Sequence, residues 1–342
     1  MDPALFDYEI PRDRIAQHPA EKRDASRLLV LDRATGRWQD RVFAELPELL
    51  RGGDCLVLND SRVIPARLQG TARGGGAVDL LFLKEVGPCR WEVLARPGKR
   101  CPVGSVILLG GAGARVVEVS KHGRRVVEVE GVGSAQSFLE RYGLPPLPPY
   151  IRRHRTPRAE DWERYQTVYA RHEGSLAAPT AGLHFTPALL AELRGRGVEV
   201  HAVTLHAGPG SFRPIRESRV EEHSMAAEEV VVPDEAARAI NRAKAEGRRV
   251  VAVGTSVVRA LEGVSGPAGR VCPVSGPTDL FIYPGYAFKV VDALVTNFHL
   301  PRYTHLMLVS ALAGRELVLA AYRHAVSAGY RFYSFGDAML IL

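Results

Sequence analysis

Short strand-like segments are concentrated between residues 70 and 132, whereas the sequence before and after them alternates apolar strands with helical segments. Runs such as Val78–Val86 and Arg125–Glu130 are separated by turns, and this spacing is typical of a small antiparallel β-barrel. Alternating strands and helices are typical of a layered α/β domain. We therefore predict an α/β fold, with a layered main domain formed by residues 1–69 and 133–342 and an inserted antiparallel β-barrel domain formed by residues 70–132.

The composition is that of an ordinary globular protein, with 46% hydrophobic and 24% charged residues. The formal net charge of +7 favours a polyanionic partner, although many basic proteins bind no nucleic acid. No apolar run approaches the roughly 18 residues that a membrane span requires. The four cysteines are scattered without a C-x-x-C pair, and the N-terminus lacks a secretory pattern. We therefore expect a cytoplasmic protein with no membrane contact.

The loop Ala177–Phe185 carries polar side chains in a stiff and otherwise apolar frame. Its proline and Gly182 disfavour a helix interior, while Thr180 and His184 supply a hydroxyl and an imidazole. A helix follows at once, with Thr186 as its N-cap. Loops that bring polar groups to a helix N-terminus commonly form ligand sites. A tight structural turn whose imidazole bonds the backbone is an equally good interpretation of this stretch.

A second polar cluster follows the apolar strand Cys55–Leu58. In the segment Asn59–Arg62, Asp60 could act as a base or bind hydroxyls, and Arg62 could bind a carboxylate or a phosphate. Polar side chains at the carboxyl end of a buried strand are a common site geometry in α/β folds. The alternative is an Asx-turn stabilised by a local Asp–Arg pair.

Three later turns also place polar groups after predicted strands. The first is a Gly-rich turn from His206 to Phe212, which could bring backbone amides close to a ligand. In the others, Thr255 opens a helix after a strand and a glycine, and Asn297 and His299 follow a strand. A glycine and a hydroxyl between a strand and a helix can bind an anion, although a locally capped turn is the commoner occurrence.

The densest cluster of cations lies in one segment and is followed by aromatic residues. Interleaved cations and aromatic rings suit phosphate contact and base stacking, whereas the alternative is a solvated loop that leads into a helix. The segment contains Arg152, Arg153, Arg155, Arg158, Trp162, Tyr165 and Tyr169.

Several common catalytic motifs are absent from the sequence. There is no strand followed by G-x-G-x-x-G, no Walker A motif, no G-x-S-x-G and no H-E-x-x-H. The histidines lie on separate loops without the ligand spacing of structural zinc, so a metal-dependent hydrolase with a site assembled in space is one alternative. A non-catalytic RNA-binding protein is another. The residues alone favour a two-domain α/β enzyme with a polar pocket built from loops.

Motifs spread over the whole chain match one family in the same order. The matching blocks are Phe6–Pro11, Asn59–Leu68, Leu147–Ile151, Tyr165–Ala170, Ala177–Thr186, Val203–His206, Val253–Thr255, Phe281–Gly285, Thr296–Pro301, Tyr330–Phe332 and Gly336–Met339. By these blocks the chain resembles the S-adenosylmethionine:tRNA ribosyltransferase-isomerase family of queuosine biosynthesis. One departure is Ala226, where the family usually has a second histidine after His223, whereas Glu228 is kept.

The resemblance implies that S-adenosylmethionine is a substrate that donates its ribosyl group rather than its methyl group. The acceptor is the aminomethyl group of a 7-deazaguanine base at the wobble position of a tRNA, and the products are epoxyqueuosine-tRNA, adenine and methionine. We therefore expect a monomeric enzyme that uses no cofactor and no metal. Its expected partner is a tRNA with a GUN anticodon that carries the deazaguanine precursor.

This chemistry requires a base beside the sulfonium, an acid for the departing adenine and a pocket poor in water. With the resemblance in place, we assign proton transfer to His184 or His206, with Asp60 orienting or sharing that role. Arg62 is expected to bind the methionine carboxylate. The other expected substrate-binding residues are Thr180, Gly182, Thr255, Asn297 and His299. The expected RNA-binding residues are Arg152, Arg153, Arg155 and Arg158, with the inserted barrel as a second contact surface.

Overall fold

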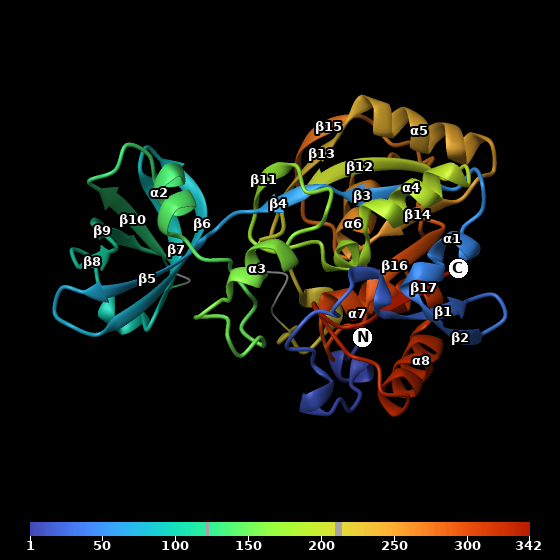
Figure 1. Ribbon diagram of the computed structural model, residues 1–342, viewed down its shortest axis with the longest axis horizontal. Coiled ribbons are helices and arrows are strands. Elements are labelled where there is room, and N and C mark those ends of the chain that lie inside the picture. Colours follow the sequence, from blue (N-terminus) through green and yellow to red (C-terminus); the bar gives the residue numbers. More distant parts are fainter. Residues whose placement is uncertain (121–122, 209–213) are drawn as a thin grey trace. The chain divides into compact units, whose positions relative to one another are not determined.

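A computed structural model of the protein describes residues 1–120, 123–208 and 214–342 (Figure 1). The strands are β1 (Arg27–Asp32), β2 (Arg37–Val42), β3 (Cys55–Asn59), β4 (Ser61–Val63), β5 (Arg67–Ala72), β6 (Ala77–Gly87), β7 (Arg90–Arg96), β8 (Val106–Leu109), β9 (Ala112–Val119), β10 (Arg125–Glu130), β11 (His172–Ser175), β12 (Glu199–Leu205), β13 (Glu228–Val232), β14 (Val250–Val253), β15 (Val274–Thr278), β16 (Ala293–Asn297) and β17 (Ala338–Ile341). The helices are α1 (Leu46–Leu49), α2 (Ala135–Tyr142), α3 (Ala159–Arg164), α4 (Pro187–Gly195), α5 (Asp234–Ala245), α6 (Thr255–Val264), α7 (Thr304–Ala313) and α8 (Arg315–Ser327). The loop before α4 contains one short 3₁₀ helix, η6 (Thr180–His184).

The chain forms two compact units. The main unit consists of residues 1–62 and 164–342, and the second unit consists of residues 63–163. The second unit is wider than the expected barrel of residues 70–132, because β5 begins at Arg67 and belongs to the barrel. The first residue of β5 also bonds the segment after α2, since the Arg67 N–H donates to the Leu144 carbonyl over 3.2 Å.

Nine of the described strands form one mixed sheet in the main unit, in the order β15-β13-β12-β3-β14-β16-β17-β1-β2 (Figure 1). The four neighbouring strands β12, β3, β14 and β16 run parallel to one another. Their carboxyl ends therefore meet at the same edge of the sheet. Since β17 runs antiparallel to β16, the segment that precedes β17 also reaches this edge.

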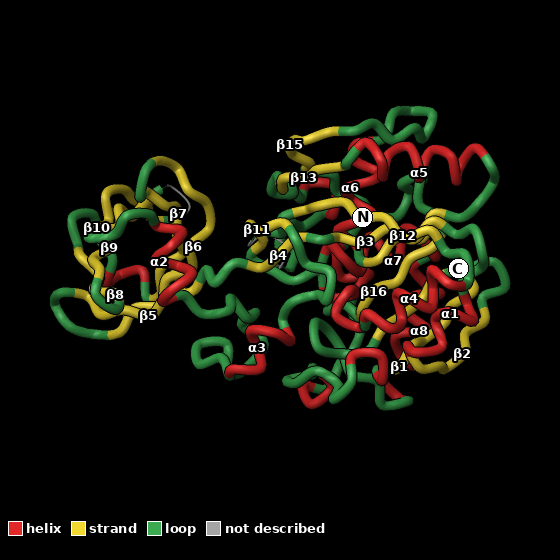
Figure 2. The backbone as a smooth tube through the Cα atoms, turned by 45° about the horizontal axis from the view of Figure 1, so that its top comes forward, coloured by secondary structure: helices red, strands yellow, loops and turns green. Residues whose placement is uncertain are grey.

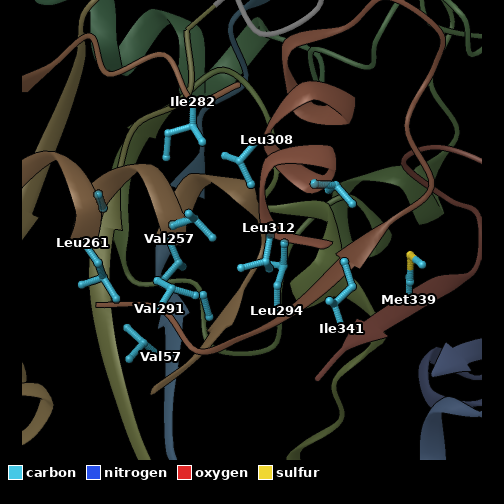
Figure 3. Close-up of a cluster of buried hydrophobic side chains, with 14 of the residues drawn as sticks. Val57, Val257, Leu261, Ile282, Val291, Leu294, Leu308, Leu312, Met339 and Ile341 are labelled. Atoms are coloured by element: carbon cyan, nitrogen blue, oxygen red, sulfur yellow. The ribbon is translucent and has the colours of Figure 1, made fainter. Parts of the chain in front are cut away.

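Both faces of this sheet are buried. In β3, Cys55 and Val57 belong to one hydrophobic core, whereas Leu56 and Leu58 belong to the other, as the two-residue period of a strand requires. Helices α5 to α8 pack on the first core, part of which Figure 3 shows with Val57 and Val257 labelled. Helices α1 and α4 pack on the second core. The layered α/β architecture predicted from the sequence is thereby confirmed.

The second unit contains a closed barrel of six described strands in the order β10-β7-β6-β5-β8-β9, drawn in yellow in Figure 2. All neighbouring strands in the barrel are antiparallel. Alternate side chains of β6, including Val78, Leu80 and Phe82, are buried inside it. The predicted inserted antiparallel barrel is confirmed.

The apolar and aromatic residues of Leu280–Tyr283 and Tyr330–Phe335 favour strands by local pattern, but both segments are loops, so that interpretation is wrong. In the second segment, the Arg331 N–H donates to the Asp337 carboxylate over 2.8 Å, and Tyr333 has a φ of +73°. The backbone therefore turns while its aromatic rings are buried. The last strand, β17, forms only after this turn.

No single helix among the described residues is long and apolar enough to cross a membrane. Helices α7 and α8 reach that length and composition only together, and they bend by 114° at the break between them.

One buried carboxylate holds a long loop of the main unit against α6. Glu262 is 1% exposed and accepts hydrogen bonds from the backbone N–H groups of Lys289, Val290 and Val291 over 3.0 Å each. It also accepts one from the Tyr286 hydroxyl over 3.2 Å. These bonds fix the loop that leads into β16.

We predict that Glu262→Gln lowers the free energy of unfolding by about 1–3 kcal/mol, because an amide N–H₂ would then face several backbone donors. Urea unfolding measures this change, with Glu235→Gln at an exposed position of α5 as the control. Equal stability of the two variants would contradict the role given to Glu262.

Candidate active site

A pocket opens where the four parallel strands end. Its lining includes residues at or just after the carboxyl ends of β3, β12, β14 and β16, among them Asn59, Leu205, Gly254 and Asn297. Residues of η6 and of the segment before β17 complete the wall. The pocket measures about 740 Å³, with its open mouth included. The predicted gathering of polar groups at strand ends is therefore present in the structure.

Asn59 ties two of these strand ends together. Its Oδ1 accepts hydrogen bonds from the Leu205 N–H over 3.0 Å and from the Ser61 N–H over 3.1 Å. Its Nδ2 donates to the Leu205 carbonyl over 3.0 Å. The side chain thus continues the hydrogen bonding between β3 and β12 beyond the strands, which keeps this wall of the pocket rigid.

His184 lies behind the pocket wall rather than in it. Its Nδ1 lies 2.7 Å from the Ser26 hydroxyl, and its Nε2 lies 3.2 Å from Asn297 Nδ2. Because an amide N–H₂ can only donate, Nε2 accepts, and the ring proton of the neutral imidazole is assigned to Nδ1. Asn297 Oδ1 is buried and has no hydrogen-bond partner among the described residues. His184 therefore orients an amide whose acceptor oxygen is left for a ligand.

Three of the other predicted binding residues also line the pocket: Thr180, Thr255 and His299. Thr255 is the first residue of α6, which follows Gly254 with a φ of +91°. This left-handed conformation suits a glycine and lets the strand turn directly into the helix. The first N–H groups of a helix lack intrahelical acceptors and carry a partial positive charge. The amino end of α6 is thus an electropositive part of the wall, which is compatible with the anion-binding turn that the sequence left open beside a locally capped turn.

Two stacked imidazoles form another part of the wall. The rings of His299 and His305 lie 5.2 Å apart at an interplanar angle of 20°. Burial lowers the pKa of His299 well below its usual range, and burial together with the charge of Arg259 lowers the pKa of His305 to about 4. Both rings are therefore neutral near pH 7. The Thr296 hydroxyl lies 2.8 Å from His299 Nε2 and fixes that ring.

Sequence reasoning missed three ionisable residues that line the pocket, namely Glu228, Arg259 and His305. Arg259 and Glu228 are both almost fully buried and form an ion pair. Two signals were available for Arg259. It is a cation flanked on both sides by apolar residues of a helix, and it follows Thr255 by four residues, which places both side chains on the same helix face.

Asp60 and His206 form a second cluster beside the pocket, which they do not line. The buried Asp60 carboxylate accepts a hydrogen bond from the Thr204 hydroxyl over 2.7 Å and lies 3.7 Å from His172 Nε2. The half-buried His206 packs on the backbone of Gly174, and its Nδ1 has no partner among the described residues. Burial and the neighbouring His172 lower the pKa of His206, while Asp60 opposes this shift. Residues 209–212 of the predicted Gly-rich turn lie outside the described part of the chain.

Two predicted binding residues lie away from the pocket. Arg62 is about half exposed on β4, and its Nε lies 3.5 Å from the Glu173 carboxylate. Gly182 is a buried residue of η6, and a Cβ there would lie 2.0 Å from the Tyr169 hydroxyl. The structure thus places Arg62 in a surface ion pair and gives Gly182 a packing role.

The four arginines predicted to bind RNA belong to the second unit and differ in their surroundings. Arg153 forms a two-pronged ion pair with the fully buried Asp161, with N–O distances of 2.6 and 3.0 Å. It therefore stabilises its own loop. Arg152, Arg155 and Arg158 are exposed, and Arg158 Nη1 lies 3.6 Å from Glu160 at the surface.

Within residues 1–120, 123–208 and 214–342, no group of three or more His, Cys, Asp or Glu side chains is arranged to hold a metal ion. His223 bonds Glu217 over 3.0 Å rather than facing the pocket. Ala226 is exposed, and only Glu228 of this segment reaches the pocket wall.

Comparison with known proteins gives a consistent result over the whole chain. The model of a family described as queuosine biosynthesis protein matches residues 4–341. The S-adenosylmethionine:tRNA ribosyltransferase-isomerases of Heliobacterium modesticaldum and Moorella thermoacetica are each 55% identical to this chain, with 100% and 98% of both chains covered, respectively. The crystal structure of an S-adenosylmethionine tRNA ribosyltransferase from Thermotoga maritima is 39% identical, with a TM-score of 0.56 over 99% of this chain and 100% of that one. The resemblance noted in the sequence is confirmed.

The two buried histidines with a pKa of about 4 predict a pH dependence of stability. Burial is the main cause of the lowered pKa of His184, as it is for His305. The unfolded chain binds protons at these histidines below about pH 6.5, whereas the folded protein does not until about pH 4. The free energy of unfolding should therefore fall as the pH drops through this window, by roughly 3 kcal/mol for each histidine.

Urea unfolding of the parent and of His184→Gln and His305→Gln, at several pH values between about 7 and 4.5, measures this effect. Each variant should show a weaker pH dependence than the parent. If both variants keep the full dependence, other groups are responsible for it.

Proposed function

The chain belongs to the queuosine biosynthesis protein family, and we propose that it is an S-adenosylmethionine:tRNA ribosyltransferase-isomerase. In this reaction the ribosyl group of S-adenosylmethionine passes to the aminomethyl group of a 7-deazaguanine in tRNA, and adenine and methionine are released. The family match over residues 4–341 carries the proposal, because every residue of the pocket lies inside it.

The pocket has the chemistry that a nucleoside substrate needs. Its wall offers hydroxyls, an unpartnered amide oxygen, neutral imidazoles and one ion pair beside apolar side chains. We assign Thr180, Thr255, Asn297 and His299 to the polar groups of adenine and ribose. Such a largely buried site keeps water from reactive intermediates during the rearrangement.

For proton transfer we propose His206, with Asp60 as the residue that modulates it. The sulfonium acidifies the adjacent C–H, and a neutral imidazole with a free nitrogen can accept that proton. The lowered pKa of His206 and its unpartnered Nδ1 within the described residues support this role. His184 acts instead through Asn297, since both of its ring nitrogens are already engaged.

The proposed RNA substrate is a tRNA with a GUN anticodon that already carries the aminomethyl-deazaguanine. The exposed Arg152, Arg155 and Arg158 are proposed to contact its phosphates. We further propose that the protein acts as a monomer in the cytoplasm, where tRNA is modified, without membrane contact, cofactor or metal.

We predict that the protein releases adenine from S-adenosylmethionine only in the presence of tRNA bearing the aminomethyl-deazaguanine. Release is measured by chromatography in the presence and in the absence of a chelator, with unmodified tRNA as the control. Tight tRNA binding without adenine release would favour a non-catalytic RNA-binding protein, and loss of release on chelation would favour metal chemistry.

In the same assay, His206→Gln should lower the rate by about 100-fold or more, the usual contribution of a general acid or base. His201→Gln is the matched control, because His201 lies on β12, the strand that His206 follows, but pairs with Glu199. A His206 variant with the parental rate would exclude His206 as the base.

We also predict that Arg155→Ala combined with Arg158→Ala weakens tRNA binding and flattens its salt dependence. Each lost phosphate contact removes about 0.7–0.9 from the slope of log K against log salt. Binding is titrated at several salt concentrations, with the exposed Arg238→Ala of α5 as the control. An unchanged slope in the double variant would place the RNA contacts elsewhere.

A further inference from the structure

Arg259 is the only guanidinium or ammonium group among the described residues that line the pocket. Its side chain is about nine-tenths buried, which is costly for a cation unless partners compensate for the loss of water. We propose that Arg259 binds the α-carboxylate of the methionine part of S-adenosylmethionine and that Glu228 is its positioning residue. This proposal rests on the function proposed above.

The guanidinium is held on two of its three nitrogens. Nε donates to the Leu280 carbonyl over 3.0 Å, and Nη1 bonds the Glu228 carboxylate. Glu228 is fixed in turn, because its Oε1 accepts a hydrogen bond from the Gly208 N–H over 2.9 Å. Nη2 is buried and has no hydrogen-bond partner among the described residues. A buried donor in this position is costly without an acceptor, and a ligand carboxylate would supply one.

The surroundings of Arg259 favour an anion. Arg259 and Thr255, the first residue of α6, both line the pocket, so the guanidinium and the amino end of the helix border the same space. There the partial positive charge of the helix end adds to that of the guanidinium. The neighbouring His305 is neutral near pH 7 and also has an unpartnered nitrogen, Nδ1, within the described residues.

The ion pair of Arg259 and Glu228 also matches the ammonium group of the methionine part of the ligand. An α-amino acid group carries a carboxylate and an ammonium close together, and the pocket wall places a guanidinium beside the Glu228 carboxylate. Arg62, the residue expected from the sequence to bind this carboxylate, lies in a surface ion pair outside the pocket. The structure therefore favours Arg259 over Arg62.

The test compares two ligands that differ only in the carboxylate: S-adenosylmethionine and its decarboxylated analogue. Their binding to the parent, to Arg259→Lys and to the matched control Arg62→Lys is measured by calorimetry. Lysine keeps a positive charge beside Glu228 but lacks the planar guanidinium that can donate two hydrogen bonds to one carboxylate. We expect Arg259→Lys to lose about 10- to 100-fold in affinity for S-adenosylmethionine and little for the analogue, and Arg62→Lys to lose neither.

Other results overturn the proposal. These are an equal loss for both ligands, no loss for either, a selective loss in Arg62→Lys, or no binding of S-adenosylmethionine to the parent protein. If Arg259→Lys fails to fold by circular dichroism, the neutral double variant Arg259→Gln/Glu228→Gln takes its place with the same expected selectivity. The adenine-release assay of the parent separates the two questions, because release together with unaltered carboxylate selectivity refutes this inference and leaves the enzymatic function intact.

Discussion

The parallel pairing of β12, β3, β14 and β16 is the constraint on which the site depends, because it brings four strand ends to one buried edge. Polar atoms at such an edge need partners, since leaving one unpaired costs about 1–3 kcal/mol. Asn59 meets this need because its Nδ2 donates to the Leu205 carbonyl and its Oδ1 accepts from the Leu205 N–H. Asn297 Oδ1 and Arg259 Nη2 have no such partner among the described residues. Both residues line the pocket, and a substrate that supplies the missing bonds best explains these two buried atoms.

The free-energy cost of burying Arg259 and Glu228 also indicates that the pocket wall serves to bind a substrate. Removing two charges from water costs several kcal/mol for each ion, and their mutual attraction often does no more than offset this cost. An apolar pair of similar volume would stabilise the fold as well or better. The pair lies in the wall of the pocket, where a fixed positive group has a use that an apolar residue lacks. The presence of this ion pair is therefore more readily explained by binding than by stability.

The sequence predicts those parts of the fold in which apolar residues recur regularly or in which turn or polar residues mark the end of a segment. Short strands between turns predict the barrel, and apolar runs that end in polar residues predict the edge at which Asn297 lies. The loop Tyr330–Phe335 has the aromatic content of a strand, but the bond from its backbone to Asp337 decides its shape, and such a tertiary bond is not visible in a local pattern. Arg62 and Arg259 show the same limit, because only the fold decides which arginine is buried in the pocket.

The positions of the arginines also distinguish those that stabilise the fold from those whose charge is available to a ligand. The net charge of the chain does not make this distinction. Arg153 lies in the most basic segment of the chain, yet its two-pronged bond with the buried Asp161 makes it part of its own loop. The exposed Arg155 and Arg158 of the second unit keep their charge at the surface, where phosphates can reach it, whereas Arg259 keeps its charge in the wall of a pocket in the main unit. Since these cations belong to different compact units, substitutions at them test the proposed RNA contacts and the proposed carboxylate contact separately.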